Sequence, residues 1–376
     1  MSTIIFADRV ITGSHDLHDA WVCVDNGFIV DAGIGNPPSG QIEQVDGWLI
    51  PGFVDIHVHG GGGGSFSHAE VATVTDFHLA HGTTTMLASL VSENLTDLQG
   101  QIDELRPHVE QGRLAGIHLE GPFIASSRRG AHNAAVLMAP STEAVEALLA
   151  TAAGTVRMVT VAPELPDAQA AIAALVRAGV VVALGHSDAT SAEAHFGVNT
   201  GATVVTHLFN GMRPMHHRES GLAEIALLDS RVRCELILDG HHLSAETTEI
   251  ALRLLGDRWF AVTDAVAAAG IADGVYSLGG LTVEARQGVV RLQPDGALAG
   301  STLTMDRAFE AILATLQRSP LEAVQATATR PASVIGRHDI GVLRPGARAD
   351  LLVWRDGAVA RVMRNGEWVA AKPHQG

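Results

Sequence analysis

Six residues with metal-binding side chains lie at or near the ends of separate apolar segments of the chain. They are His57, His59, Glu120, His186, His207 and Asp264. Imidazole nitrogens and carboxylate oxygens are common ligands of divalent metal ions in proteins. His57 and His59 are two residues apart, so an extended backbone directs both imidazoles to the same side. One such histidine is often only a packed core residue, but five segments that end in ligand-type residues favour a metal centre.

The apolar segments predict the scaffold that positions these residues. Eight runs of strand length alternate with helix-like stretches, and they are continuously apolar, which is typical of parallel strands buried on both faces. Ala-rich stretches such as Glu143–Ala152 and Ala168–Ala178 provide crossover helices. The predicted strands are Phe53–His59, Thr84–Val91, Leu114–Glu120, Val156–Ala162, Val180–Ser187, Val204–Phe209, Cys234–Asp239 and Phe260–Asp264. Eight such units indicate a TIM-type (β/α)8 barrel of the α/β class, whose active site lies at the C-terminal ends of the strands.

The two ends of the chain have a different, β-rich pattern. Residues 1–50 contain short strand-like runs and a hairpin turn at Asp25-Asn26-Gly27, and the C-terminal residues repeat this pattern around a turn at Asp356-Gly357. We therefore expect a small β-sandwich domain built from both termini, residues 1–50 plus 336–376, and a barrel domain at residues 51–335. The segment Gly270–Gly300 is rich in glycine and β-formers, and it predicts a hairpin region inserted over the barrel mouth.

Composition narrows the chemistry and the partners. The 376 residues include 41 acidic and 25 basic side chains, and the net charge of −16 argues against nucleic-acid and anionic-membrane partners. Lys372 is the only lysine, which excludes a pyridoxal-phosphate Schiff base, a Walker-type phosphate loop and a carbamylated lysine between two metals. Cys23 and Cys234 lack metal-type spacing and predict reduced thiols in a cytoplasmic protein. We expect neither a signal peptide nor a membrane span.

Several motifs together resemble a known family. PGFVDIHVHG at 51–60 and GVLRPGARADLLV at 341–353 are similar to the opening and closing signatures of the amidohydrolase superfamily. Seven further motifs resemble the N-acetylglucosamine-6-phosphate deacetylases within it: HLEGPF (118–123), GAHN (130–133), GHSDAT (185–190), THLFNGM (206–212), HHRESG (216–221), LDGHH (238–242) and VTDA (262–265). The resemblance covers nearly the whole chain. It implies metal-dependent hydrolysis of the N-acetyl amide of N-acetylglucosamine 6-phosphate to glucosamine 6-phosphate and acetate, in amino-sugar recycling.

The resemblance also implies which residues bind metal. Glu120, His186 and His207 match the ligands of the family's main ion. His57 and His59 are intact, so a second ion that shares Glu120 is expected, with Asp264 beside it. This donor set suits Zn²⁺ or Fe²⁺ better than Mg²⁺, and one or two divalent ions per subunit are expected.

The same resemblance implies roles in catalysis and substrate binding. Asp264 is expected to take a proton from the attacking water and to pass one to the leaving amine, and His132 is expected to hydrogen-bond the acetyl carbonyl. Arg218 and His242 are expected to bind the sugar phosphate, at a clamp completed across a homodimer interface. The other expected substrate contacts are Ala131, Asn210, Gly211, Leu298, Ala299 and Gly300.

Three alternative functions stay open from the sequence alone. The N-acetylgalactosamine 6-phosphate epimer differs from the expected substrate only in the orientation of one hydroxyl group. Another amide hydrolase of the superfamily would use a similar metal centre, although the dihydroorotase-like members commonly need a bridging lysine that this chain cannot supply. A non-catalytic scaffold on the same barrel is disfavoured, because all six ligand-type residues are present.

Overall fold

A computed structural model describes residues 2–369 of the chain. Residues 370–376 of the predicted β-sandwich domain, with Lys372 among them, lie outside the described residues. The structure divides into two compact units. The first runs to Asp55, takes in Asp76–Thr85 and resumes at Thr304, whereas the second consists of Ile56–Thr75 and Met86–Leu303. The domain boundaries expected after residue 50 and before residue 336 stay a prediction.

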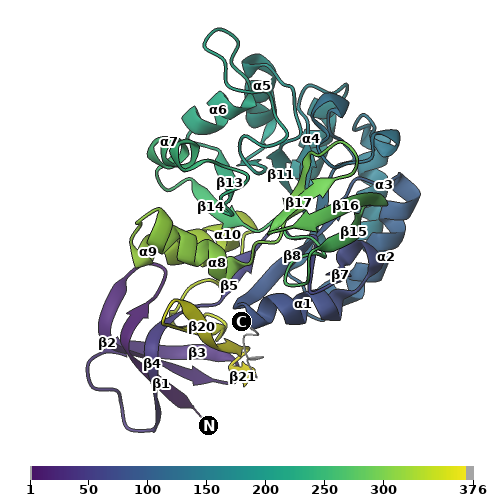
Figure 1. The fold of residues 1–376 in the computed structure, drawn as a ribbon. Coiled ribbons are helices and arrows are strands. Elements are labelled where there is room, and N and C mark those ends of the chain that lie inside the picture. The colour runs from purple at the N-terminus through teal and green to yellow at the C-terminus, as the bar shows by residue number, and fades with distance from the viewer. Residues whose placement is uncertain (1, 370–376) are drawn as a thin grey trace. The chain divides into compact units, whose positions relative to one another are not determined.

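Eight parallel strands form one sheet in which each strand pairs with its neighbours along the chain (Figure 1). Beyond the two outermost strands, backbone hydrogen bonds of 2.8 Å join His59 to Ala265 and Asp264 to His57. These bonds link the two ends of the sheet, so the barrel is nearly closed at its mouth, and the predicted TIM-type barrel is confirmed. The strands are β5 (Phe53–Asp55), β8 (Thr83–Val91), β9 (Gly116–Glu120), β10 (Val156–Val161), β11 (Val181–Leu184), β12 (Val204–Val205), β13 (Arg233–Ile237) and β14 (Trp259–Val262).

All eight predicted strands are present, but several end before the ligand-type residues that were expected to close them. β11 stops at Leu184 and β12 at Val205, each two residues before a histidine. The backbone φ is 48° at His186, 25° at His207 and 50° at Asp264. A positive φ is incompatible with an extended strand, so the chain leaves the sheet at these points.

Helices connect successive barrel strands. They are α1 (Val71–Ala80), α2 (Leu95–Glu110), α3 (Thr142–Ala152), α4 (Ala168–Arg177), α5 (Ser191–Thr200), α6 (Leu222–Leu228) and α7 (Ala245–Leu255), with short 3₁₀ helices at Phe66–His68, Ser126–Arg128 and Ala134–Val136. Four of them begin at side chains that accept a backbone N–H of the first turn: Asn94, Ser141, Thr190 and Ser244. Such caps satisfy donors that the helix itself leaves unpaired and set where each helix starts.

A four-stranded antiparallel sheet follows the last barrel strand, as predicted for the segment Gly270–Gly300. Its strands are β15 (Gly274–Leu278), β16 (Leu281–Arg286), β17 (Val289–Leu292) and β18 (Leu298–Ser301). Val283 and Val290 of this sheet pack with Val91 and Val266, which lie at the ends of β8 and β14. Nearby, the glycine-rich segment after β5 forms the short pair β6 (Gly60–Gly61) and β7 (Gly64–Ser65).

The first unit contains a sheet to which both ends of the chain contribute. Its strands, in spatial order, are β21 (Glu367–Val369), β20 (Ala358–Arg364), β19 (Leu351–Arg355), β4 (Gln41–Pro51), β1 (Thr3–Ile11), β2 (Asp16–Asp25) and β3 (Phe28–Ile34). Ile5, Val22, Leu49 and Val353 share its core. A side chain at Gly27 would meet the carbonyl oxygen of Asn365 at 3.0 Å, so the turns that precede the edge strands β3 and β21 approach each other closely. The small β domain predicted from both termini is confirmed.

The remaining helical segments of the first unit are α8 (Met305–Glu310), α9 (Pro320–Val324) and α10 (Arg330–Val334), with π-helical turns at Ala311–Thr315 and Gln325–Thr329. Within residues 2–369, none of the helices combines the length and the apolar character needed to cross a membrane.

Candidate active site

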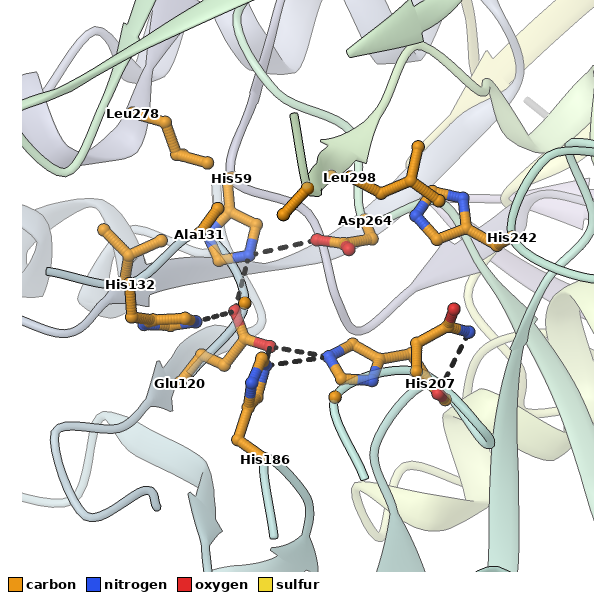
Figure 2. A pocket seen from close by; sticks show the side chains of 16 residues that line it. His59, Glu120, Ala131, His132, His186, His207, His242, Asp264, Leu278 and Leu298 are labelled. Carbon is orange, nitrogen blue, oxygen red and sulfur yellow. Dashed lines mark hydrogen bonds and ion pairs between the residues drawn. The ribbon is translucent and has the colours of Figure 1, made fainter. Parts of the chain in front are cut away.

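A pocket opens beyond the C-terminal ends of the barrel strands, where the sequence places the functional residues. It encloses about 790 Å³ of empty space, part of it open to solvent. Leu278 and Leu298 of the inserted sheet line it together with the polar side chains (Figure 2). Those polar side chains include His59, Glu120, His132, His186, His207 and Asp264. All of them belong to the second unit, so a single compact unit builds the site.

Glu120, the last residue of β9, lies at the centre of the site, and its two carboxylate oxygens face different ligands (Figure 2). Oε1 lies 3.0 Å from Nε2 of His186 and 3.0 Å from Nε2 of His207; we call these two histidines the His186 group. Oε2 lies 3.1 Å from Nε2 of His59 and 3.5 Å from Nε2 of His57. Glu120, which was expected to be shared by two metal ions, thus lies between two sets of donor atoms.

The set around Oε2 includes a second carboxylate. Oδ1 of Asp264 lies 3.2 Å from Nε2 of His59 and 3.5 Å from Nε2 of His57. We call His57, His59 and Asp264 the Asp264 group. Their ligand atoms, together with one of Glu120, all lie within 4.8 Å of one another.

The outer ring nitrogens of the histidines fix how the rings face the centre. Nδ1 of His59 lies 3.2 Å from the carbonyl oxygen of Ser89, and Nδ1 of His186 lies 2.8 Å from that of Arg128. A carbonyl oxygen only accepts hydrogen bonds, so each Nδ1 carries the proton. In the neutral form of each ring Nε2 then has the lone pair and faces the site, which is how metal-binding histidines are held in proteins.

The donor set fits a divalent metal ion. Nε2 of His186 lies 3.0 Å from Nε2 of His207, and Nε2 of His57 lies 3.2 Å from that of His59. Two imidazole lone pairs at this separation repel each other unless a cation or a proton lies near them. Three to four nitrogen and carboxylate ligands with room for a further ligand are typical of catalytic zinc and iron sites.

Burial and charge act in opposite directions on the ionisable groups of the site. Burial would raise the pKa of Glu120, but the charge of His57 and hydrogen bonds from His132 and His186 hold it well below its usual range. Burial would lower the pKa of His59, but hydrogen bonds to Asp264 and Glu120 raise it to about 9. Glu120 is therefore a carboxylate at neutral pH, in the state that can accept from donors on both sides.

His132 adds a hydrogen-bond donor beside the carboxylates. Burial lowers its pKa to about 4, so the ring is neutral at pH 7. The backbone N–H of Ser92 donates to Nδ1 at 3.2 Å, which leaves the proton of the neutral ring on Nε2. That Nε2 lies 3.4 Å from Oε2 of Glu120 and faces the pocket (Figure 2). The ring can therefore donate a hydrogen bond to a ligand without bringing a net charge.

Most of the expected substrate contacts line the pocket, and two do not. Ala131, Asn210, Gly211, His242, Leu298 and Gly300 all line it. Ala299 is buried and does not contribute to the lining. Arg218 is exposed on the loop before α6, where its guanidinium contacts Nε2 of His217 at 2.8 Å. Nδ1 of His242 lies 2.7 Å from Oδ2 of Asp239, and despite its burial this contact raises the pKa of the imidazole.

Two of these positions require glycine because the backbone approaches ligand residues closely. Gly211 has φ +58°, and a Cβ there would lie 2.8 Å from Nδ1 of His186. Gly300 has φ +67°, and a Cβ there would lie 2.8 Å from the backbone oxygen of Asp264. At both positions the backbone itself therefore forms the surface next to the ligand residues.

Comparisons with known proteins bear on this arrangement. The model of the Amidohydrolase family matches residues 48–369 of the chain. This chain belongs to the amidohydrolase family. A solved structure of an N-acetyl-D-glucosamine-6-phosphate deacetylase mutant from Mycobacterium smegmatis, in complex with N-acetyl-D-glucosamine-6-phosphate, is 41% identical with a TM-score of 0.95, over 98% of this chain and 99% of that chain.

Two curated relatives carry related names. The N-acetylglucosamine-6-phosphate deacetylase of Bos taurus is 36% identical over 83% of this chain and 81% of its own length. The N-acetylgalactosamine-6-phosphate deacetylase of Escherichia coli O157:H7 is 32% identical over 95% of this chain and 96% of its own length. Members of the amidohydrolase family are metal-dependent hydrolases, and the observed cluster of histidine and carboxylate side chains is of the kind that can bind a metal ion.

Several residues of this amidohydrolase site were not anticipated. Ser92 bonds the ring of His132, with its Oγ 2.8 Å from Nδ1, and Glu235 contacts His57 from inside the barrel. Neither stands in a motif with ligand spacing. The one available signal for Glu235 is a charged residue within the apolar run Cys234–Asp239. His118 packs inside the barrel, where it bonds Ser89 and Thr160.

Proposed function

We propose that this amidohydrolase removes the N-acetyl group of N-acetylglucosamine 6-phosphate, giving glucosamine 6-phosphate and acetate. The observation that carries the proposal is Glu120 between two groups of metal-type ligands, at the base of a pocket that His132 and Asp264 also line. Relatives named for this activity, including one solved with the same sugar phosphate, support the choice of substrate.

The residues of the site suit amide hydrolysis in distinct roles. A divalent ion held by these residues would lower the pKa of a water molecule and polarise the amide carbonyl. Asp264 takes the proton of the attacking water as its oxygen bonds to the carbonyl carbon, and the proton then passes to the amine nitrogen as the C–N bond breaks. His132 donates from Nε2 to the carbonyl oxygen, on which negative charge develops. The products are acetate and the free amine.

The ligands of the ion are proposed as His57, His59, Glu120, His186, His207 and Asp264. We propose Zn²⁺ or Fe²⁺, one or two ions per subunit, because imidazole-rich sites with few carboxylates favour these ions over Mg²⁺. Total metal analysis of the purified protein distinguishes these ions. A preparation that is fully active with Mg²⁺ alone would contradict the choice.

The phosphate and the sugar are proposed to bind at the side of the pocket formed by Asn210, Gly211 and His242. Arg218 lies outside the pocket of its own subunit, exposed on a loop. We therefore propose a homodimer in which the clamp on the phosphate is completed across the interface. Sedimentation of the protein at working concentration tests the dimer, and a monomer of full activity would overturn this part of the proposal.

A cytoplasmic location is also proposed. It is supported by two free cysteines, Cys23 and Cys234, which are buried rather than disulfide-bonded.

Acetate release from the metal-loaded protein tests the proposed reaction. The substrates are N-acetylglucosamine 6-phosphate, its galactosamine epimer and unphosphorylated N-acetylglucosamine, at equal concentration. We expect rapid release from the glucosamine phosphate and little from the unphosphorylated sugar. Equal rates with and without phosphate would contradict the phosphate site, and no release from any of them, with metal bound, would overturn the proposed reaction.

The galactosamine epimer is the second candidate substrate, because the relative from Escherichia coli O157:H7 carries that name at comparable identity. A higher kcat/KM on that epimer would make N-acetylgalactosamine 6-phosphate the preferred substrate, and the proposed deacetylation chemistry would be unchanged.

A further inference from the structure

Glu235 is a buried carboxylate on β13 that none of the proposed steps uses. Its side chain is fully buried inside the barrel. Oε2 lies 2.9 Å from Nδ1 of His57 and accepts the backbone N–H of His207 at 3.1 Å. Within residues 2–369, Oε1 has no hydrogen-bond partner. A charged group is expensive to bury, so a carboxylate held with only one of its oxygens bonded requires a reason.

We propose that Glu235 is a positioning residue that holds His57 in the orientation and tautomer needed to bind metal in the Asp264 group. The proposal rests on the metal centre of the proposed function. Under this proposal, Glu235 determines whether the Asp264 group holds an ion in addition to the one at the His186 group.

The hydrogen bond fixes the chemical state of the ring. Oε2 of Glu235 accepts from Nδ1 at 2.9 Å, so in the neutral, metal-binding form of His57 the proton lies on Nδ1. The lone pair then lies on Nε2, which is the nitrogen directed at Glu120 and Asp264, 3.5 Å from an oxygen of each. Without an acceptor at Nδ1, the proton is free to move to Nε2, where it would block the metal ligand.

The partner of Nδ1 differs among the proposed ligand histidines His57, His59 and His186. Nδ1 of His59 and of His186 contact backbone carbonyl oxygens, whereas Nδ1 of His57 contacts a full negative charge. A carboxylate partner makes the imidazole a stronger electron donor to a metal than a carbonyl partner does. Its negative charge also balances part of the positive charge of a bound ion.

Glu235 also links the two groups of ligands. The same Oε2 contacts His57 of the Asp264 group and the backbone of His207 of the His186 group. His207 has φ 25°, an uncommon backbone conformation for a non-glycine residue, so an acceptor for its N–H stabilises that turn. Oε2 of Glu235 therefore accepts from both His57 and His207, whereas Oε1 accepts from neither.

Glu235→Gln tests the proposal with a readout that does not depend on turnover. Glutamine keeps the shape, but its N–H₂ group can face Nδ1 and no longer requires a proton there. We measure the Zn²⁺ content after dialysis by mass spectrometry and the Zn²⁺ affinity by competition with a chelator. We expect one ion per subunit fewer than in the wild type, or an affinity about 10–100-fold lower for one ion, as outer partners of metal ligands typically contribute.

Two further variants separate this role from a general structural one. Thr160→Val removes another buried hydrogen-bonding side chain of the barrel interior, which bonds Thr206 and His118, and it should leave the Zn²⁺ content unchanged. In a His57→Asn background, Glu235→Gln should lower the Zn²⁺ content less than it does in the wild type, because the part of its effect that passes through His57 is already lost. If Glu235→Gln does not fold, Glu235→Asp shortens the reach to His57 and should lower the affinity for one ion in the same way.

Wild-type Zn²⁺ content and affinity in Glu235→Gln would overturn the proposal. So would a loss of Zn²⁺ that is equally large with and without His57→Asn, and so would a wild-type protein that binds only one ion and keeps it in Glu235→Gln. Deacetylation by the wild type is measured separately, so a failed positioning role is distinguishable from a wrong reaction.

Discussion

Replacing Asp264 by asparagine is the sharpest test of the proposed chemistry. The side chain is buried to 7% exposure and still lines the pocket, with Oδ1 3.2 Å from Nε2 of His59. Asparagine has nearly the same shape and keeps one oxygen for that contact. It cannot take a proton from water, so the change removes the proposed base and leaves the geometry in place.

The size of the effect follows from what is removed. General acid–base catalysis by a positioned side chain contributes about 10²–10⁴-fold to the rate. At about 1.4 kcal/mol per factor of ten, this corresponds to about 3–5 kcal/mol of transition-state stabilisation. We expect kcat on N-acetylglucosamine 6-phosphate to fall by this factor, with KM nearly unchanged because ground-state contacts remain. The Glu120 bridge and the histidines should still hold the metal.

The assay is continuous acetate release, with metal content and melting temperature measured on the same preparation. Asp306→Asn is the matched control, because Asp306 is also a buried acid (3% exposed) but does not line the pocket. The control should lose stability and keep kcat. An Asp264→Asn enzyme with kcat within tenfold of the wild type and full metal content would refute the reasoning.

Three further predictions concern single groups. Ser92→Ala removes the hydroxyl 2.8 Å from Nδ1 of His132. Because one neutral hydrogen bond contributes about 1 kcal/mol, kcat should fall about fivefold at unchanged metal content. An unchanged kcat would contradict the proposed role of His132 as hydrogen-bond donor to the carbonyl oxygen. Burial raises the pKa of the Cys234 thiol to about 12, so iodoacetamide at pH 8 should leave this residue unmodified in the folded protein, as peptide mass spectrometry would show. Burial would raise the pKa of Asp306, but a hydrogen bond from His81 lowers it. The ionised Asp306 should therefore stabilise the fold above about pH 4, the usual aspartate pKa, and this stabilisation should be lost on further acidification. The melting temperatures of the wild type and of Asp306→Asn should converge at that low pH and differ at pH 7.

The sequence predicts the barrel well because buried parallel strands leave a strong signal. Most positions of the eight strands are apolar, and Glu120, His186, His207 and Asp264 stand at the end of a strand or two residues beyond it. The C-terminal ends of parallel strands meet at one end of a barrel, so residues as distant in sequence as His57 and Asp264 are expected to lie together. They do, with His57 Nε2 3.5 Å from Asp264 Oδ1.

Two features of the site escape such reasoning. Glu235 lies inside a strand, and nothing in a continuous apolar run tells which side of the strand faces the barrel interior. The place of Arg218 depends on the loop before α6, whose path is set by contacts such as the one between the His216 backbone and Glu224 rather than by periodicity. The position of a loop residue relative to the pocket therefore does not follow from its motif.

The strand ends show why the ligands are where they are. His186, His207, Phe209 and Asp264 have φ of 48°, 25°, 75° and 50°, conformations that cost about 1–3 kcal/mol each for residues other than glycine. Histidine and aspartate adopt a positive φ more readily than most residues, but it remains uncommon for them, and Phe209 has no such preference. The barrel must therefore impose them through its closed sheet and through bonds such as Asp264 N–H to His57 O at 2.8 Å. In these conformations His186 and His207 each place Nε2 3.0 Å from Oε1 of Glu120, so the strained turns lie where the donor atoms converge.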